Sequence, residues 1–299
     1  MNTPFSDCLF RWHAIFETPD PALNEFATSV CDFVEEINMI EEAFHIVPLR
    51  HLTESNSVHP RDGKPLAALT FDDALDSQAR FALPVLEARR LPYTLCIPTG
   101  PVTDRRPLWN TLLRLCILRA PARSLDLGWT SFALAPGVDR LAVAQEVQDL
   151  LLCMSEPQWS HVIEKLFCQF ADVIDEYSSG SNIRSMTWEQ IAALDPTLFE
   201  PASHSVPHRP FVEADSAEAQ LRDAVSSRTT IERHLSRPCL VFSFPFGIFT
   251  AASCESVRRA GYEILLTSCT VPAGAMGNNL YGRFDGKAVR MLRATKRPH

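Results

Sequence analysis

Two acidic residues and two histidines stand where buried strands are expected to end. Asp72 and Asp73 close the apolar stretch 66–73, and His204 and His208 are four positions apart. Adjacent carboxylates in a partly buried site repel each other unless a cation compensates, and two imidazoles at this spacing can converge on one metal ion if the segment makes a helical turn. Both features also have ordinary explanations, because acidic residues often cap helices and an HxxxH spacing arises by chance in a chain with nine His.

The segments around these residues alternate between strands and helices. Buried strands are expected at 8–16, 44–49, 66–73, 92–100, 198–204, 239–247 and 263–269. Helices are expected at 24–40, 77–90, 186–194, 217–235 and 251–262. This order predicts an α/β protein with a parallel sheet and right-handed crossovers, and the number of repeats suggests a barrel.

A different pattern occupies residues from about 107 to 183. The stretches 108–120, 139–154 and 159–174 carry apolar residues at helical spacing, and no strand candidate of comparable strength lies between them. We therefore expect a single domain that spans residues 1–299 and contains a helical insertion at about 107–183.

Composition and charge exclude some classes of protein. The net charge of −8 argues against a general binder of nucleic acids or anionic membranes. The nine cysteines include no CxxC pair and sit mostly in apolar stretches, which indicates free thiols in a reducing compartment. The N-terminal segment does not read as a signal peptide, and no apolar run approaches the roughly 20 residues of a membrane span. We expect a cytoplasmic protein with neither a membrane span nor a nucleic-acid partner.

Four segments, in this order, resemble the motif series of the polysaccharide deacetylases, the carbohydrate esterase family with the NodB-type domain. They are LTFDD (69–73), ASHSVPH (202–208), FSFPFG (242–247) and AGYEILLTS (260–268). Flanking stretches such as 81–100 extend the resemblance to roughly residues 10–295. The resemblance implies a distorted TIM-like (β/α)7 barrel, a divalent metal that is usually Zn²⁺, and hydrolysis of an N-acetyl or related acyl group.

Carried over by position, the resemblance assigns a role to each motif residue. Asp73, His204 and His208 would hold the metal, and Asp72 would be the general base. One carboxylate and two imidazoles leave an open coordination position, as in hydrolytic zinc sites, where the metal can polarise an amide carbonyl and lower the pKa of water. The backbone N–H of Phe246, just after the motif proline, would complete an oxyanion hole.

The chain departs from the commonest family pattern at its proton donor. The usual C-terminal Leu-x-His motif is absent, but the Arg-Trp-His segment at 11–13 resembles the aromatic-His pair with which one branch of the family begins. His13 is therefore the candidate acid that protonates the leaving amine, and its alternative is a hydrogen-bonded core histidine. The segment 291–293 resembles the terminal arginine motif of the same branch, so Arg293 would orient Asp72.

Three further positions bear on activity and substrate. Ala74 stands where the family has Gly, which costs roughly 1–2 kcal/mol if the position needs a positive φ. Phe246 replaces the commoner Tyr, so a hydroxyl near the substrate is lost while the backbone donor remains. Trp109 and Phe246 are candidates to stack on a sugar face, although Trp109 is equally compatible with the core of the inserted helix.

These observations favour an N-deacetylase for an amino sugar, with a nucleotide-, lipid- or metabolite-linked substrate rather than an extracellular polymer. A second interpretation keeps the metal site but makes the protein a deformylase or another C–N hydrolase with a non-sugar substrate. A third is a catalytically inactive barrel that binds a saccharide or a protein partner. The presence of Ala74 and the absence of the C-terminal His favour the third interpretation. The joint presence of the acidic pair and the two histidines argues against it.

Overall fold

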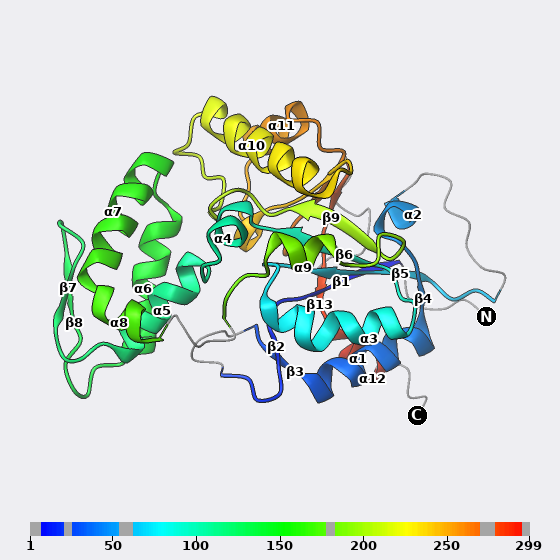
Figure 1. Cartoon of the computed structure of the whole chain (residues 1–299), viewed down its shortest axis with the longest axis horizontal. Helices are drawn as coiled ribbons and strands as arrows, with labels where there is room; N and C mark the ends of the chain where they lie inside the picture. The colour runs from blue at the N-terminus through cyan, green and yellow to red at the C-terminus, as the bar shows by residue number, and fades with distance from the viewer. Residues whose placement is uncertain (1–6, 21–25, 54–61, 178–182, 270–278, 295–299) are drawn as a thin grey trace.

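A parallel sheet forms the centre of the molecule in the computed structural model, which describes residues 7–20, 26–53, 62–177, 183–269 and 279–294 (Figure 1). Its strands are β1 (Cys8–Trp12), β4 (His45–Ile46), β5 (Leu66–Phe71), β6 (Tyr93–Ile97), β9 (Phe199–Ser203), β10 (Val241–Ser243), β11 (Ile264–Leu266), β12 (Leu280–Tyr281) and β13 (Phe284–Asp285). They follow the order β12-β11-β10-β9-β6-β5-β1-β13, with β4 paired to β5 outside this path. Every pairing is parallel, so the carboxyl ends of the strands lie along one rim.

The sheet curls without closing. Strands β12 and β13 stand at the two ends of the path, and within the described ranges no strand pairing joins them. Only Gly282 and Arg283 separate these two strands in the chain, so the two edges of the sheet lie near each other. The short strands β12 and β13 were not predicted, because two-residue strands give no periodic signal.

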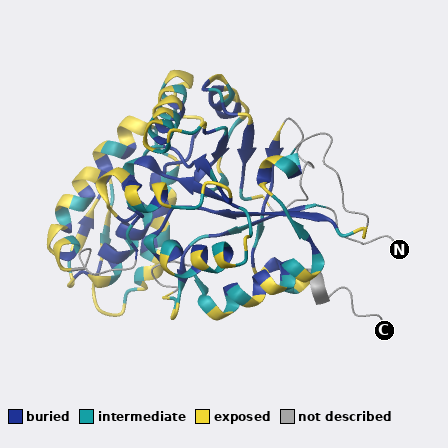
Figure 2. Cartoon of the chain, turned by 45° about the vertical axis from the view of Figure 1, so that its right-hand side comes forward, coloured by how far each residue is buried: buried dark blue, intermediate teal, exposed yellow. Residues whose placement is uncertain are grey.

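Helices cover the outside of the sheet, and they present buried residues inward and exposed residues outward (Figure 2). They are α1 (Val30–Ala43), α2 (Leu49–Thr53), α3 (Leu83–Ala88), α4 (Thr99–Asp104), α9 (Trp188–Ala192), α10 (Ala217–Leu235), α11 (Ala251–Arg259) and α12 (Ala288–Ala294). Helix α1 begins later than predicted, because Ser29 caps it by accepting a hydrogen bond from the backbone N–H of Asp32 at 3.0 Å. The helix predicted at 77–90 begins with a π-helical turn at Gln78–Ala82.

Four of the helices that lie between β6 and β9 form, with a hairpin, a group beside the sheet (Figure 1, green). They are α5 (Trp109–Arg119), α6 (Arg140–Leu152), α7 (Glu156–Gln169) and α8 (Ala171–Tyr177), with β7 (Ser124–Asp126) pairing antiparallel to β8 (Ser131–Ala133). The group has its own apolar cluster, which includes Leu113, Leu151 and Leu166. The sequence predicted only helices here. It missed the hairpin because strands of three residues are too short to give a periodic signal, although their burial alternates around Leu125 and Phe132.

None of the helices in the described ranges combines the length and the apolar composition that crossing a bilayer demands. The single-domain division of the chain remains a prediction.

The tight packing of Trp12, at the end of β1, against Gly286 leads to a prediction about the free energy of unfolding. The indole of Trp12 is 2% exposed and donates to Glu36 at 2.9 Å, and a Cβ on Gly286 would overlap its ring. Gly286→Ala should therefore lower the free energy of unfolding by about 1–3 kcal/mol, measured by urea denaturation. The matched control is Gly137→Ala, where φ is +83° and no atom would meet the new Cβ within 4 Å, so only backbone strain of about 1 kcal/mol is expected. Equal losses in the two variants would contradict the packing argument.

Candidate metal centre

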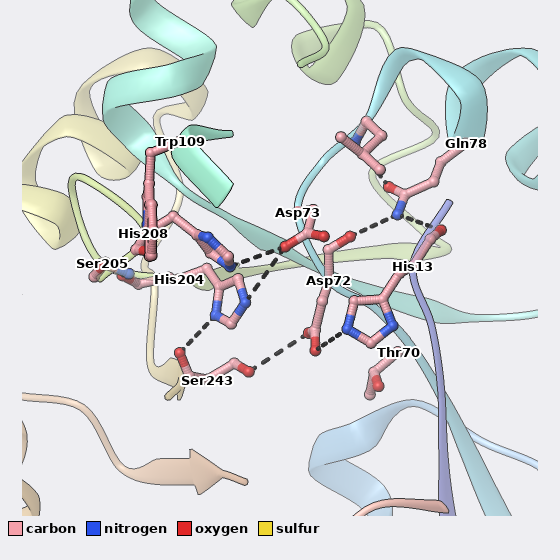
Figure 3. Close-up of polar contacts among 12 residues, drawn as sticks. His13, Thr70, Asp72, Asp73, Gln78, Trp109, His204, Ser205, His208 and Ser243 are labelled. Carbon is pink, nitrogen blue, oxygen red and sulfur yellow. Dashed lines mark hydrogen bonds and ion pairs between the residues drawn. The ribbon is translucent and has the colours of Figure 1, made fainter. Parts of the chain in front are cut away.

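Asp73, His204 and His208 meet at the rim of the sheet (Figure 3). Asp73 follows β5 and the two histidines follow β9, and all three side chains are buried. Oδ1 of Asp73 lies 3.1 Å from Nε2 of His208 and 3.7 Å from Nε2 of His204. One candidate ligand atom from each residue lies within 4.8 Å of the other two. Oδ1 of Asp73 is buried without a hydrogen-bond partner, so this donor set fits a divalent cation.

The imidazole of His204 is held in the orientation that a metal ligand needs. Its Nδ1 lies 2.7 Å from the carbonyl oxygen of Ser243, at the end of β10, and donates to it, which leaves the lone pair of Nε2 directed toward Asp73. Burial lowers the pKa of His204 to about 4, so the ring is neutral at pH 7. Neutral imidazole is the form that binds metals.

The loops that carry these residues adopt left-handed backbone conformations. The φ angles are +80° at Asp73, +46° at Ala74, +63° at Ser205 and +56° at His208. Ala74 therefore adopts a positive φ, which costs a residue other than Gly roughly 1–2 kcal/mol. The conformation of this loop is stabilised by a 2.7 Å hydrogen bond that the backbone N–H of Met186 donates to the carbonyl oxygen of Ala74.

Asp72 is an ionised carboxylate that Arg283 holds in place. The guanidinium donates to Oδ1 at 2.7 Å and to Oδ2 at 2.8 Å, and both side chains are almost wholly buried. Burial by itself would raise the pKa of Asp72, but the charge and hydrogen bonds of Arg283, together with His204 and His13, outweigh burial and hold this pKa well below the ordinary value. The site thus contains a carboxylate that is ionised at neutral pH.

Arg283 makes the contact with Asp72 that the sequence analysis predicted for Arg293. Arg293 lies in α12, and its side chain is outside the described residues. Both oxygens of Asp72 are bonded to Arg283, a residue that the sequence analysis did not single out, and the role assigned to Arg293 stays a prediction. A signal was present in the sequence: Arg283 is the one charged residue in the stretch 280–284, between Tyr281 and Phe284.

His13, the residue predicted to donate a proton, directly follows β1 and lies beside Asp72. Its Nε2 is 3.7 Å from Oδ2 of Asp72, and its ring stacks on Phe26 at a centroid distance of 5.0 Å. The amide of Gln78 donates to the carbonyl oxygens of both His13 and Asp72, at 2.9 and 2.6 Å (Figure 3). Burial lowers the pKa of His13. The sequence analysis did not identify Phe26 or Gln78, because neither belongs to a recognised motif.

The two aromatic residues predicted to bind sugar have different positions. Phe246 has a φ of +59°, lines the cavity over the acidic pair and places its ring 5.0 Å from that of His208. Trp109 is 5% exposed and is not among the described residues that line this cavity. Its Nε1 donates to the carbonyl oxygen of His208 at 2.7 Å, so it braces a candidate ligand loop as a core residue of α5.

The cavity above the acidic pair has a volume of about 360 Å³. The sheet contributes Asp72, Asp73 and the histidines to its wall, and the inserted helices contribute Asn110, Thr111, Arg114 and Gln148. The arrangement combines a cation site, an ionised base and an imidazole at one opening, which suits metal-assisted hydrolysis.

Solved structures share this architecture. The Streptococcus pyogenes deacetylase PplD, solved in complex with acetate, matches with a TM-score of 0.62 at 15% identity, over 99% of this chain and 100% of PplD. IcaB from Ammonifex degensii matches with a TM-score of 0.61 at 14% identity, over 97% and 96% of the two chains. This chain has the NodB-type deacetylase fold. The predicted distorted α/β barrel is thereby confirmed.

A third structure with this deacetylase fold, the de-N-acetylase from Aggregatibacter actinomycetemcomitans, matches with a TM-score of 0.57 at 12% identity, over 94% of this chain and 95% of its own. No protein-family model matches the sequence, and no curated protein does. Likeness at this level of identity establishes the fold and leaves the chemistry to be argued from the site.

The buried ion pair of this deacetylase fold generates a prediction about stability and pH. Arg283→Gln leaves Asp72 buried without its cation, so the free energy of unfolding should fall by about 3–5 kcal/mol at pH 7. In the parent protein, Asp72 has a pKa below its unfolded value, so its contribution is present above about pH 4 and is lost as pH falls through the folded pKa. In the Arg283→Gln variant Asp72 becomes protonated instead. The difference between the free energies of unfolding of the two proteins, measured by urea titration, should therefore decrease as the pH falls from 7 to 4.

Arg106→Gln is the control, because it removes an arginine whose exposed ion pair with Asp104 contributes at most about 1 kcal/mol. If the loss of unfolding free energy caused by Arg283→Gln does not change with pH, Asp72 is not the group whose charge Arg283 compensates.

Proposed function

We propose that this protein is a metal-dependent hydrolase that removes an N-acyl group, N-acetyl in the first instance, from an amino sugar. The proposal includes membership of the polysaccharide deacetylase family, in the branch with the N-terminal aromatic-His motif. The observation that carries it is the convergence of Asp73, His204 and His208 directly beside the ionised Asp72. The deacetylase names of the structural neighbours support the same chemistry.

The proposed metal ligands are Asp73, His204 and His208, and the proposed metal is Zn²⁺. A divalent cation held there would polarise the acyl carbonyl and lower the pKa of water. One carboxylate with two imidazoles is a donor set that zinc accepts in hydrolytic sites.

The residues around the cation site supply proton transfer and charge stabilisation. Asp72, held ionised by Arg283, takes the proton from the attacking water. The backbone N–H of Phe246 is the proposed hydrogen-bond donor to the oxygen that gains charge in the tetrahedral intermediate. His13 lies 3.7 Å from Asp72, and its lowered pKa leaves it neutral at rest, so we propose that it receives the proton that Asp72 took from water and passes this proton to the leaving amine. Arg283 orients the base, and a role for Arg293 remains a prediction.

The substrate that we propose is a nucleotide-, lipid- or metabolite-linked amino sugar in the cytoplasm. All nine cysteines are free, which agrees with a reducing compartment. Ala74 no longer favours an inactive barrel, because it adopts the positive φ of the family's Gly while Asp73 keeps its place beside the histidines. Release of formate rather than acetate from N-acylated sugars would identify the protein as a deformylase.

The central prediction separates metal binding from catalysis. Asp72→Asn should keep one zinc per chain, since Asp72 is not a ligand, and should lower acyl release by about 10²–10⁴-fold because the general base is lost. Asp73→Asn should lose the metal and the activity together. The measurements are zinc content by mass spectrometry and release of acetate or formate from a panel of N-acylated sugars. Undiminished turnover by Asp72→Asn would show that the base is misassigned, and zinc without acyl release from any amide would favour a binding protein.

A second prediction concerns the proton donor. His13→Gln should lower kcat for N-acetyl sugars by at least about tenfold, because an unprotonated amine is a very poor leaving group. The loss should be smaller for an acyl substrate with an activated phenol as leaving group, which departs without a proton. His234→Gln is the matched control, since that imidazole stacks on Trp188 in another part of the molecule. An equal loss for both kinds of leaving group would place His13 in a structural role.

A further inference from the structure

We infer that the substrate carries an anionic group on the acylated sugar, bound by Arg11, while Asn110 and Gln148 hydrogen-bond the sugar hydroxyls. This inference rests on the proposed function for the identity of the sugar as an N-acyl amino sugar. Recognition of the anion can nevertheless be measured without catalysis.

Arg11 is a charged residue in the wall of the cavity, and two of its guanidinium nitrogens have no hydrogen-bond partner among the described residues. It projects from β1 and lines the cavity together with Asp72 and Asp73. Its Nε and Nη1 are buried without a hydrogen-bond partner, and within the described ranges no carboxylate oxygen lies within 4.0 Å of its guanidinium. Buried donors of this kind are rare in folded proteins, and unpaired ones point to a missing ligand.

The carboxylates nearest to Arg11 interact mainly with other groups. Both oxygens of Asp72 are bonded to Arg283, and Asp73 faces the two histidines of the proposed metal site. Asp285, the register neighbour of Arg11 on β13, attracts Arg11 without forming an ion pair with it, and its carboxylate lies 4.0 Å from the exposed Lys287. A metal-loaded cavity therefore retains the positive charge of Arg11. A guanidinium matches the two oxygens of a carboxylate or a phosphate, so an anionic substituent is the complementary ligand.

The inserted helices contribute uncharged polar groups to the same cavity. Oδ1 of Asn110 in α5 is buried without a partner. Gln148 in α6 is 6% exposed, lines the cavity and makes no side-chain hydrogen bond with another described residue. Amides both donate and accept, as sugar hydroxyls do. At about 360 Å³ the cavity lies at the small end of ligand sites, which suits one sugar residue with its substituent.

The test measures binding to zinc-loaded Asp72→Asn by calorimetry, so that no turnover is needed. Because this variant leaves Arg283 without its carboxylate, only the part of the anion preference that Arg11→Gln removes supports the inference. The probes are N-acetylglucosamine, its 1-phosphate, its 6-phosphate and N-acetylmuramic acid, which carries a carboxylate. At least one anionic sugar should bind about tenfold or more tightly than neutral N-acetylglucosamine, and the comparison distinguishes phosphate from carboxylate. Adding Arg11→Gln should reduce that preference to less than about threefold, whereas Arg11→Lys should keep part of it.

Two further variants separate the anion from the sugar ring. Asn110→Leu and Gln148→Leu should weaken the binding of neutral and anionic sugars by similar factors. The ratio of the two affinities should therefore stay unchanged. Arg119→Gln removes an exposed arginine from the far end of α5 and should change nothing. Urea denaturation of each variant confirms that the fold is intact.

Affinities within threefold for neutral and anionic sugars, a preference that survives Arg11→Gln, or no binding by any of the four sugars would each overturn the inference. Failure of the proposed hydrolase has a different signature. In that case native zinc-loaded protein releases no acyl group from any probe, while the Arg11-dependent preference for anionic sugars remains.

Discussion

The buried pair of Asp72 and Arg283 is the interaction on which the site depends. Taking two charges out of water costs several kcal/mol each, and the pair is tolerable only because its remaining donors are also satisfied. Arg283 meets this condition by donating to Thr70, to Ser243 and to the carbonyl oxygen of Thr267, at 3.1, 2.9 and 3.2 Å. These partners belong to or follow β5, β10 and β11, so one side chain ties three strand ends together.

The position of Arg283 in the chain gives the pair a second role. It lies between β12 and β13, the two strands that end the sheet at opposite edges. A curled sheet with an open seam needs something across the gap, and here that element is a fully buried guanidinium. The charge that keeps Asp72 ionised is thus also part of what holds the sheet in its curved form.

Backbone strain is concentrated at the same rim. Asp73, Ala74, Ser205, His208 and Phe246 all have positive φ, and none of them is Gly. Strain of this kind persists only where the surrounding structure over-determines the conformation, and it clusters at functional sites. The parallel sheet supplies that surrounding structure, for example through the 3.0 Å hydrogen bond from the backbone of His204 to Ile97.

The sequence predicted the parts of the site that follow from parallel topology. Residues that end buried parallel strands share one rim, so Asp73 and His204 were expected to meet although about 130 positions separate them. What the sequence did not predict depends on short or irregular elements. Arg283 lies between two-residue strands that give no periodic signal, so the resemblance alone directed attention to Arg293. The π-helical turn that carries Gln78 could not be foreseen either, since its pattern reads as an ordinary helix.

The hydrogen bond from Trp109 to the carbonyl oxygen of His208 has a consequence for how this protein could be re-engineered or could have diversified. It makes the first inserted helix a structural support of the loop beside it, in addition to a wall of the cavity. Transplanting residues 109–177 from a relative would therefore alter two properties at once, the shape of the opening and the stiffness of the histidine loop. A chimera that retains an indole at position 109 would change the first while preserving the second.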